Sequence, residues 1–113
     1  MSVLMIRAHK RFAVCRKARL RKPGRRGADG LLIELSLDGC RISNVEQQGF
    51  ELDQLVTVRV EGAQPFDGRI RWQRDGTLGL RFVKPLRIAA LDQLIRLCRG
   101  ELSAAEPMRS YGT

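Results

Sequence analysis

The sequence predicts a mainly β protein, a six-stranded antiparallel β-barrel followed by one C-terminal α-helix. Three observations predict it: apolar and polar residues alternate in short runs over residues 12–82, turn-forming residues separate the runs, and the apolar period lengthens after Pro85. A barrel is preferred to a sandwich because closure hides the strand edges. We expect a flexible basic N-terminal arm over residues 1–11, the barrel and helix over 12–100, and a flexible tail over 101–113.

The first strand is expected over residues 12–20 and is followed by an exposed hairpin loop over 21–30, where Pro, Gly and charged residues gather. The strand's apolar residues share one parity, namely Phe12, Val14, Ala18 and Leu20. Residues 31–36 form the second strand and 40–43 the third, with a turn at 37–39 between them.

The fourth strand is expected around residues 56–60, where three valines alternate with Thr and Arg. Residues 66–73 and 78–82 supply the fifth and sixth strands. They flank Asp75-Gly76, a dipeptide that favours the tight primed turns of β-hairpins. The last two strands are therefore expected to pair with each other.

The period of apolar residues after Pro85 is that of an amphipathic helix. The apolar stripe recurs at spacings of three and four and comprises Ile88, Leu91, Leu94, Ile95 and Cys98. Gly100 follows where a helix C-cap is expected. We expect the stripe to pack on the barrel, and the alternative is that it mediates homodimerisation.

Positive charge is concentrated at the start of the chain. The formal net charge is +9, and residues 1–27 hold ten of the 21 Lys and Arg and no acidic residue. Such a block attracts an anion, whether a nucleotide, nucleic acid, an acidic protein or a membrane surface.

Several classes of protein are disfavoured. No apolar stretch is long enough for a membrane span and no secretory signal is recognisable, so a soluble, cytoplasmic protein is expected. Cys15, Cys40 and Cys98 lack CxxC spacing and are expected to be small core residues rather than metal ligands or disulfides. One histidine, His9, and no nucleophile beside a base argue against an enzyme, and we expect neither a cofactor nor a metal.

Two arginines four residues apart, Arg7 and Arg11, immediately precede the first strand. Guanidinium groups there can reach over the mouth of the barrel, where they offer planar, bidentate donors to phosphates and to guanine O6 and N7. Lys10 and His9 lie between the two arginines and are accessory candidates.

An acid and a hydroxyl lie two residues apart at the end of the second strand, in Glu34 and Ser36, and should share one face of the sheet. Glu34 can accept guanine N1 and N2 hydrogens, Ser36 can give or take a hydrogen bond, and Gly39 permits a close ligand approach. Together with the two arginines they indicate a site for a small, doubly charged phosphate ligand. The alternative is that Ser36 and Gly39 only build a hairpin turn.

These two motifs, RxxxR before a strand and (D/N)xSxxG at a strand end, resemble those of the PilZ domain family, the bacterial receptor module for cyclic di-GMP. The resemblance covers about residues 7–99, including a closing hairpin like that of the family at residues 68–82. It implies that Arg7 and Arg11 engage phosphates and guanines. Glu34, in the Asp or Asn position, would line the barrel side with Ser36 and Gly39.

The resemblance implies a cyclic di-GMP receptor that changes its surface on ligand binding and acts in trans on an effector protein of motility, pili or exopolysaccharide export. One alternative is a PilZ adaptor that acts through proteins without ligand, because Glu34 carries one methylene more than the family's residue. Another is nonspecific nucleic-acid binding. Nucleic-acid binding is disfavoured because the aromatic content is only 5% and Trp72 and Phe82 are expected to face the core, so few aromatic side chains are available to stack on bases.

Overall fold

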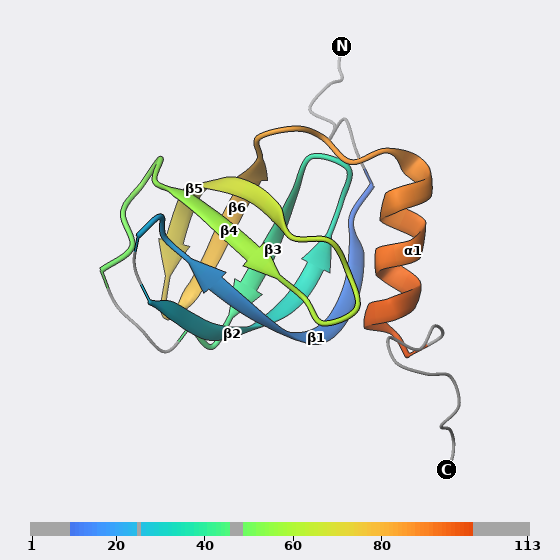
Figure 1. Cartoon of the computed structure of the whole chain (residues 1–113), viewed down its shortest axis with the longest axis horizontal. Coiled ribbons are helices and arrows are strands. Elements are labelled where there is room, and N and C mark those ends of the chain that lie inside the picture. Colours follow the sequence, from blue (N-terminus) through green and yellow to red (C-terminus); the bar gives the residue numbers. More distant parts are fainter. Residues whose placement is uncertain (1–9, 25, 46–48, 101–113) are drawn as a thin grey trace.

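The computed structural model describes residues 10–24, 26–45 and 49–100. Six strands and one helix follow in this order: β1 (Phe12–Arg21), β2 (Gly27–Leu35), β3 (Gly39–Ser43), β4 (Leu55–Arg59), β5 (Phe66–Arg74), β6 (Thr77–Phe82) and α1 (Ile88–Cys98). The strands close into a barrel and α1 packs beside it (Figure 1). The predicted fold class is confirmed.

All neighbouring strands are antiparallel, in the closed order β1-β2-β3-β6-β5-β4. The barrel closes where β4 returns to β1 and places Arg59 opposite Arg19. The β5–β6 hairpin turns at Asp75 and Gly76, whose φ values of 51° and 79° are those of the predicted primed turn.

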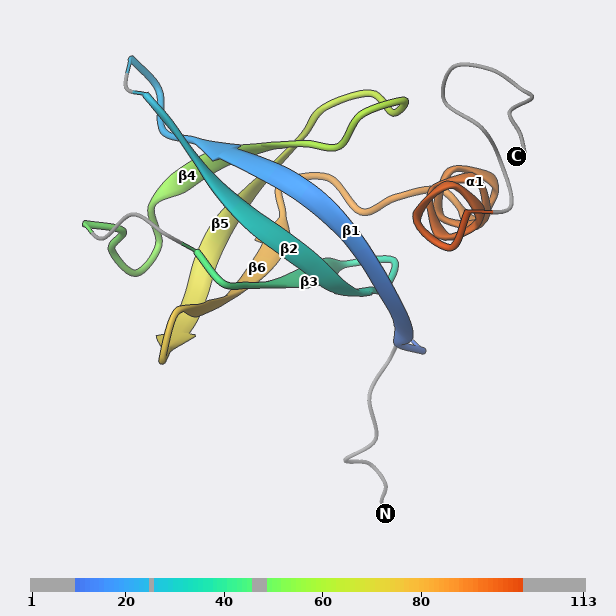
Figure 2. The same ribbon diagram turned by 90° about the horizontal axis from the view of Figure 1, so that it is seen from below.

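The barrel interior is filled by aliphatic side chains, of which the largest that are fully buried are Leu20, Leu32, Leu35, Ile42, Ile70, Val56, Val58 and Val60. Helix α1 lies beside β1 (Figures 1 and 2), and two arginines link them. Arg99 donates from Nε and Nη2 to the Ala13 carbonyl oxygen, at 3.1 and 2.8 Å, and Arg16 donates to that of Leu97 at 3.3 Å. The predicted packing of the helix on the barrel is therefore confirmed.

Three expectations about burial or boundaries are wrong in detail. Ile88, assigned to the apolar stripe, is 76% exposed because it occupies the first helical position, whereas Leu97 is buried. Cys15 is exposed on the outer face of β1, while Cys40 and Cys98 are buried as predicted. Strand β2 begins at Gly27, because cross-strand pairing with β1 overrides the turn preference of the residues up to Gly30.

Trp72 does not face the core as predicted. It is 37% exposed on the outer surface, whereas Phe82 is buried as expected. The pairing of β5 with β6 shifts register between Ile70 and Trp72, which reverses the inward and outward parity. Trp72 therefore lies on the outer face, opposite Gly79 of β6.

The predicted N-terminal arm is described only from Lys10 onward, and its Arg7 and His9 lie outside the described residues, as does the predicted tail over 101–113. Within the part of the chain that the structure describes, no helix is long and apolar enough to cross a membrane.

Candidate functional site

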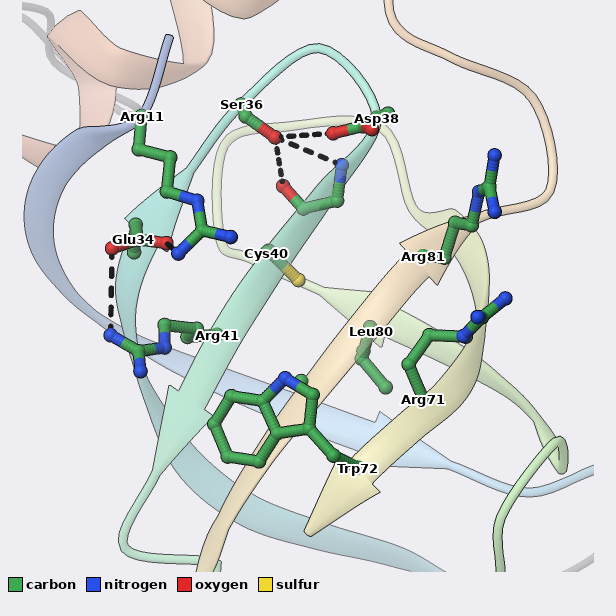
Figure 3. Close-up of a pocket in the computed structure, with 12 residues that line it drawn as sticks. Arg11, Glu34, Ser36, Asp38, Cys40, Arg41, Arg71, Trp72, Leu80 and Arg81 are labelled. Atoms are coloured by element: carbon green, nitrogen blue, oxygen red, sulfur yellow. Dashed lines mark hydrogen bonds and ion pairs between the residues drawn. The ribbon is translucent and has the colours of Figure 1, made fainter. Parts of the chain in front are cut away.

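A cavity of about 330 Å³ opens on the outer face of the barrel, beside the residue that precedes β1 (Figure 3). It is lined by Arg11, Glu34, Ser36, Asp38, Gly39, Cys40, Arg41, Arg71, Trp72, Gly79, Leu80 and Arg81. Strands β2, β3, β5 and β6 thus supply its walls. Four arginines against two carboxylates leave it with an excess of two positive charges.

Glu34 lies between two arginines on one side of the cavity (Figure 3). Its Oε2 is 3.5 Å from Nη1 of Arg11, and its Oε1 is 3.6 Å from Nη1 of Arg41. Arg41 is the cross-strand partner of Glu34 in the pairing of β2 with β3. The carboxylate side chain is 23% exposed, and both separations exceed those of a direct charged hydrogen bond. Such pairs are weak, so an incoming anion can replace Glu34 as the partner of either arginine.

The rim of the cavity is a tight turn built by Ser36. Its hydroxyl lies 2.8 Å from Asp38 Oδ1 and 3.2 Å from the Gly39 carbonyl oxygen, both acceptors for its hydrogen, and it accepts a hydrogen bond from the Gly39 N–H at 3.1 Å. The Asp38 carbonyl oxygen in turn accepts from the Phe82 N–H at 2.8 Å. A Cβ on Gly39 would collide with the carbonyl oxygen of Leu80, so only glycine allows β3 to approach β6 here.

Trp72 and Arg41 form a cation–π pair on the floor of the cavity. The Arg41 guanidinium carbon lies 5.2 Å from the centroid of the Trp72 ring, within the range of a cation–π contact. The ring covers Gly79, where a Cβ would overlap three indole atoms. Buried Arg41 Nε has no hydrogen-bond partner among the described residues.

Arg71 and Arg81 lie on the other side of the cavity from Glu34 (Figure 3). In the described part of the chain neither has an ion pair or a side-chain hydrogen bond. Cys40 also lines the cavity. Burial, and to a smaller extent the Glu34 carboxylate, raises the pKa of its thiol above the usual range. The thiol therefore stays protonated at neutral pH and is a poor nucleophile.

The structure brings together four of the predicted site residues, Arg11, Glu34, Ser36 and Gly39, at one cavity. Ser36 lies one residue beyond the end of β2 rather than on the strand. Lys10 does not line the cavity, and its Nζ lies 5.5 Å from the centroid of the Phe12 ring. Whether any of these residues binds a ligand stays a prediction.

Sequence reasoning missed eight lining residues, and five of them have charged or aromatic side chains, namely Asp38, Arg41, Arg71, Trp72 and Arg81. One signal for Trp72 was present: counting outward from the Asp75-Gly76 turn pairs Trp72 with Gly79. Aromatic residues often cover a cross-strand glycine on an exposed sheet face. No comparable signal marks the three arginines.

Comparison with curated proteins gives no match. Comparison with protein families matches residues 5–100 to the PilZ domain, which covers both motifs, the barrel and the helix. PilZ domains are cyclic di-GMP-binding or adaptor domains rather than enzymes. The chain therefore belongs to the PilZ domain family.

Proposed function

We propose that this protein binds cyclic di-GMP in the cavity described above and thereby regulates an effector protein in trans, in motility, pilus function or exopolysaccharide export. The observation that carries the proposal is the position of Arg11. Directly before β1, its guanidinium reaches the same cavity as the Ser36–Gly39 turn. One arginine of the first motif thus lies beside the turn of the second motif.

The charge and shape of the cavity suit this ligand. Its excess of two positive charges matches the two phosphodiesters of cyclic di-GMP. Arginine forks bind phosphate bidentately and also match the paired acceptors O6 and N7 of guanine, whereas adenine has an amino donor in place of O6. The Trp72–Arg41 pair provides a planar surface on which a base can stack.

Ligand binding requires Arg11 and Arg41 to leave Glu34. Exposed ion pairs contribute about 0.2–1 kcal/mol each. A charged hydrogen bond to a phosphate oxygen contributes about 1.5–3 kcal/mol, so exchange of partners favours the complex. Because Arg11 directly precedes β1, binding changes the charge and order of the surface at the start of the barrel. An effector that contacts this surface would then distinguish the two states.

Isothermal titration calorimetry tests the proposal, with cyclic di-GMP, cyclic di-AMP and GTP as ligands. We expect cyclic di-GMP to bind most tightly. Arg11→Ala should weaken its binding about tenfold to a hundredfold, the effect of one charged hydrogen-bonding group. Ser36→Ala should also weaken binding, through loss of the rim turn as well as of the hydroxyl.

Arg74→Ala is the matched control, because Arg74 is exposed at the end of β5 and does not line the cavity. Its affinity should equal that of the wild type. Unchanged affinity in both Arg11→Ala and Ser36→Ala would refute the site assignment.

One observation favours a second candidate, a PilZ adaptor that acts through proteins without ligand. Glu34 already partners both Arg11 and Arg41, so the cavity is partly neutralised by the chain itself. Capture of an effector to the same extent with and without cyclic di-GMP, together with no calorimetric response, would support this candidate.

A further inference from the structure

A second positively charged surface lies away from the cavity, on the outer face of β1 and β4. In the closed strand order β4 is three places from β3, and Figure 2 shows the two strands on opposite sides of the barrel. We call this surface the β1–β4 basic face. Its cations are Lys17, Arg19, Arg21 and Arg59. Lys22 follows β1 at the edge of this face, and its ammonium donates to the Gly49 carbonyl oxygen.

The register of the two strands brings like charges together. Arg19 and Arg59 are direct cross-strand partners, and such partners have Cβ atoms about 4.5–5.5 Å apart. Along β1, Lys17, Arg19 and Arg21 alternate, which spaces them by about 6.6–6.8 Å along the strand. Two hollows of about 440 and 340 Å³ adjoin the face, and both are lined by Arg19 and Arg59. The pair therefore forms a ridge between two hollows.

Few carboxylates offset these charges. Asp29 pairs with Arg19 at 2.7 Å, and Glu61 lines the larger hollow. Among the described residues, Lys17, Arg21 and Arg59 have no carboxylate within ion-pair distance. Like charges directly opposite each other destabilise a sheet. A bound anion would relieve this repulsion, which makes the face a docking surface rather than a neutral part of the barrel.

We propose that the β1–β4 basic face docks an acidic, extended segment of a partner protein. Carboxylates on alternate residues of an extended segment recur at the same spacing as the cations of β1 and can each take a guanidinium fork. The partner's role as the regulated effector rests on the proposed function, whereas the docking itself rests on the face alone. Because the cavity lies elsewhere on the barrel, the segment and cyclic di-GMP can be bound at once.

Nucleic acid fits the face less well. The cations of β1 span only about 13 Å, whereas tight binding of a duplex uses on the order of six to ten phosphate contacts. Neither hollow is lined by an aromatic side chain, so bases find no stacking surface there. The two carboxylates interrupt the positive track that a phosphate backbone would follow.

Fluorescence anisotropy with a labelled ten-residue peptide of alternating glutamate and threonine tests the proposal, with the matching glutamine peptide as the neutral probe. We expect the glutamate peptide to bind and the glutamine peptide not to bind. Arg59→Glu should weaken binding about tenfold or more, since it removes one charged contact and adds repulsion. Its melting temperature should stay the same or rise, because the new carboxylate faces Arg19.

Arg74→Glu is the matched control, because it changes the net charge equally. Arg74 pairs with Thr77, at the other end of β5 from the residues that pair with β4. We expect it to weaken binding by less than about threefold, the range of a screened long-range effect. Equal losses of peptide affinity in the two variants would overturn the proposal, because the peptide would then respond only to the net charge of the protein.

Competition with a 20-base-pair DNA duplex separates the two classes of partner. We expect the duplex to compete poorly with the peptide for the wild-type protein. Tighter binding of the duplex, lost in Arg59→Glu but not in Arg74→Glu, would overturn the assignment to a protein segment. Titration of the same samples with cyclic di-GMP keeps the proposals apart. Peptide binding without nucleotide binding would reject only the receptor function, and the reverse result would reject only the docking face.

Discussion

Replacing Gly79 with alanine should displace Trp72, the single tryptophan of the chain, from the floor of the cavity. A Cβ at this position would overlap Nε1, Cε2 and Cδ1 of the indole. The obstacle is the body of a rigid ring, so the ring must move as a whole. Its cation–π contact with Arg41 is then lost.

The size of the effect follows from the surface that the ring covers. If displacement uncovers about 100 Å² of apolar surface, the loss at about 25 cal/mol per Å² is about 2.5 kcal/mol. Loss of a partly exposed cation–π contact adds about 0.5–1 kcal/mol. Because the displaced ring can find other contacts, we expect the free energy of unfolding to fall by about 2–3 kcal/mol. Binding of cyclic di-GMP should weaken as well, since the stacking surface is gone.

Two measurements check this prediction. Urea denaturation followed by circular dichroism gives the free energy of unfolding, and intrinsic fluorescence reports the surroundings of Trp72 alone. We expect a red-shifted emission in Gly79→Ala, because the ring becomes more exposed. A double-mutant cycle with Trp72→Ala isolates the contact, and the cost of Gly79→Ala should largely vanish in that background. An equal cost with and without the indole would refute the reasoning.

Three further predictions concern charge, the helix and the buried thiol. The sequence assigns Glu34 to the ligand, but its carboxylate pairs with Arg11 and Arg41 in the structure, so we expect it to compete with the ligand instead. Glu34→Gln should therefore tighten cyclic di-GMP binding about threefold to tenfold in calorimetry. Arg99→Ala should lower the free energy of unfolding by about 1–2 kcal/mol in urea denaturation, since two hydrogen bonds to the Ala13 carbonyl oxygen are lost. Burial raises the pKa of the Cys40 thiol, so the unfolded chain loses this proton at a lower pH than the folded chain. The free energy of unfolding should therefore fall as the pH rises above about 9, and it should fall less steeply in Cys40→Ala.

The fold could be predicted from local signals. Alternation and one apolar run, residues 31–36, located the six strands. The Asp75-Gly76 dipeptide located the last hairpin, because positive φ at both residues is costly for most other pairs. The start of β2 could not be predicted in the same way. Gly27 and Gly30 look like turn residues, yet the pairing of this segment with the neighbouring strand β1, Ala28 with Leu20, decides their conformation.

The site was predictable only where its residues are close in sequence. Glu34 lies near the end of β2, Ser36 in the turn that follows and Gly39 at the start of β3, so their closeness in sequence is enough to bring them to one cavity. Arg41 and Arg81 reach the same cavity through the pairing of β3 with β2 and β6. A register across strands is a long-range property, so no spacing along the chain reveals it.

Two of the irregularities in strand pairing lie at residues that line the cavity. Register shifts lie between Ala13 and Arg16, between Leu32 and Glu34, and between Ile70 and Trp72. The second shift lets Leu32 and Leu35 both point inward and turns Glu34 to the cavity, and the third places Trp72 with Arg71 on the outer face. Regular alternation would have directed Trp72 into the core, where its indole N–H would need a partner.

Bulges that re-aim side chains in this way cost pairing energy and are frequent beside functional sites. Two of the positions where simple alternation fails thus carry cavity residues, which is the pattern expected if binding, rather than stability, determines the sequence there.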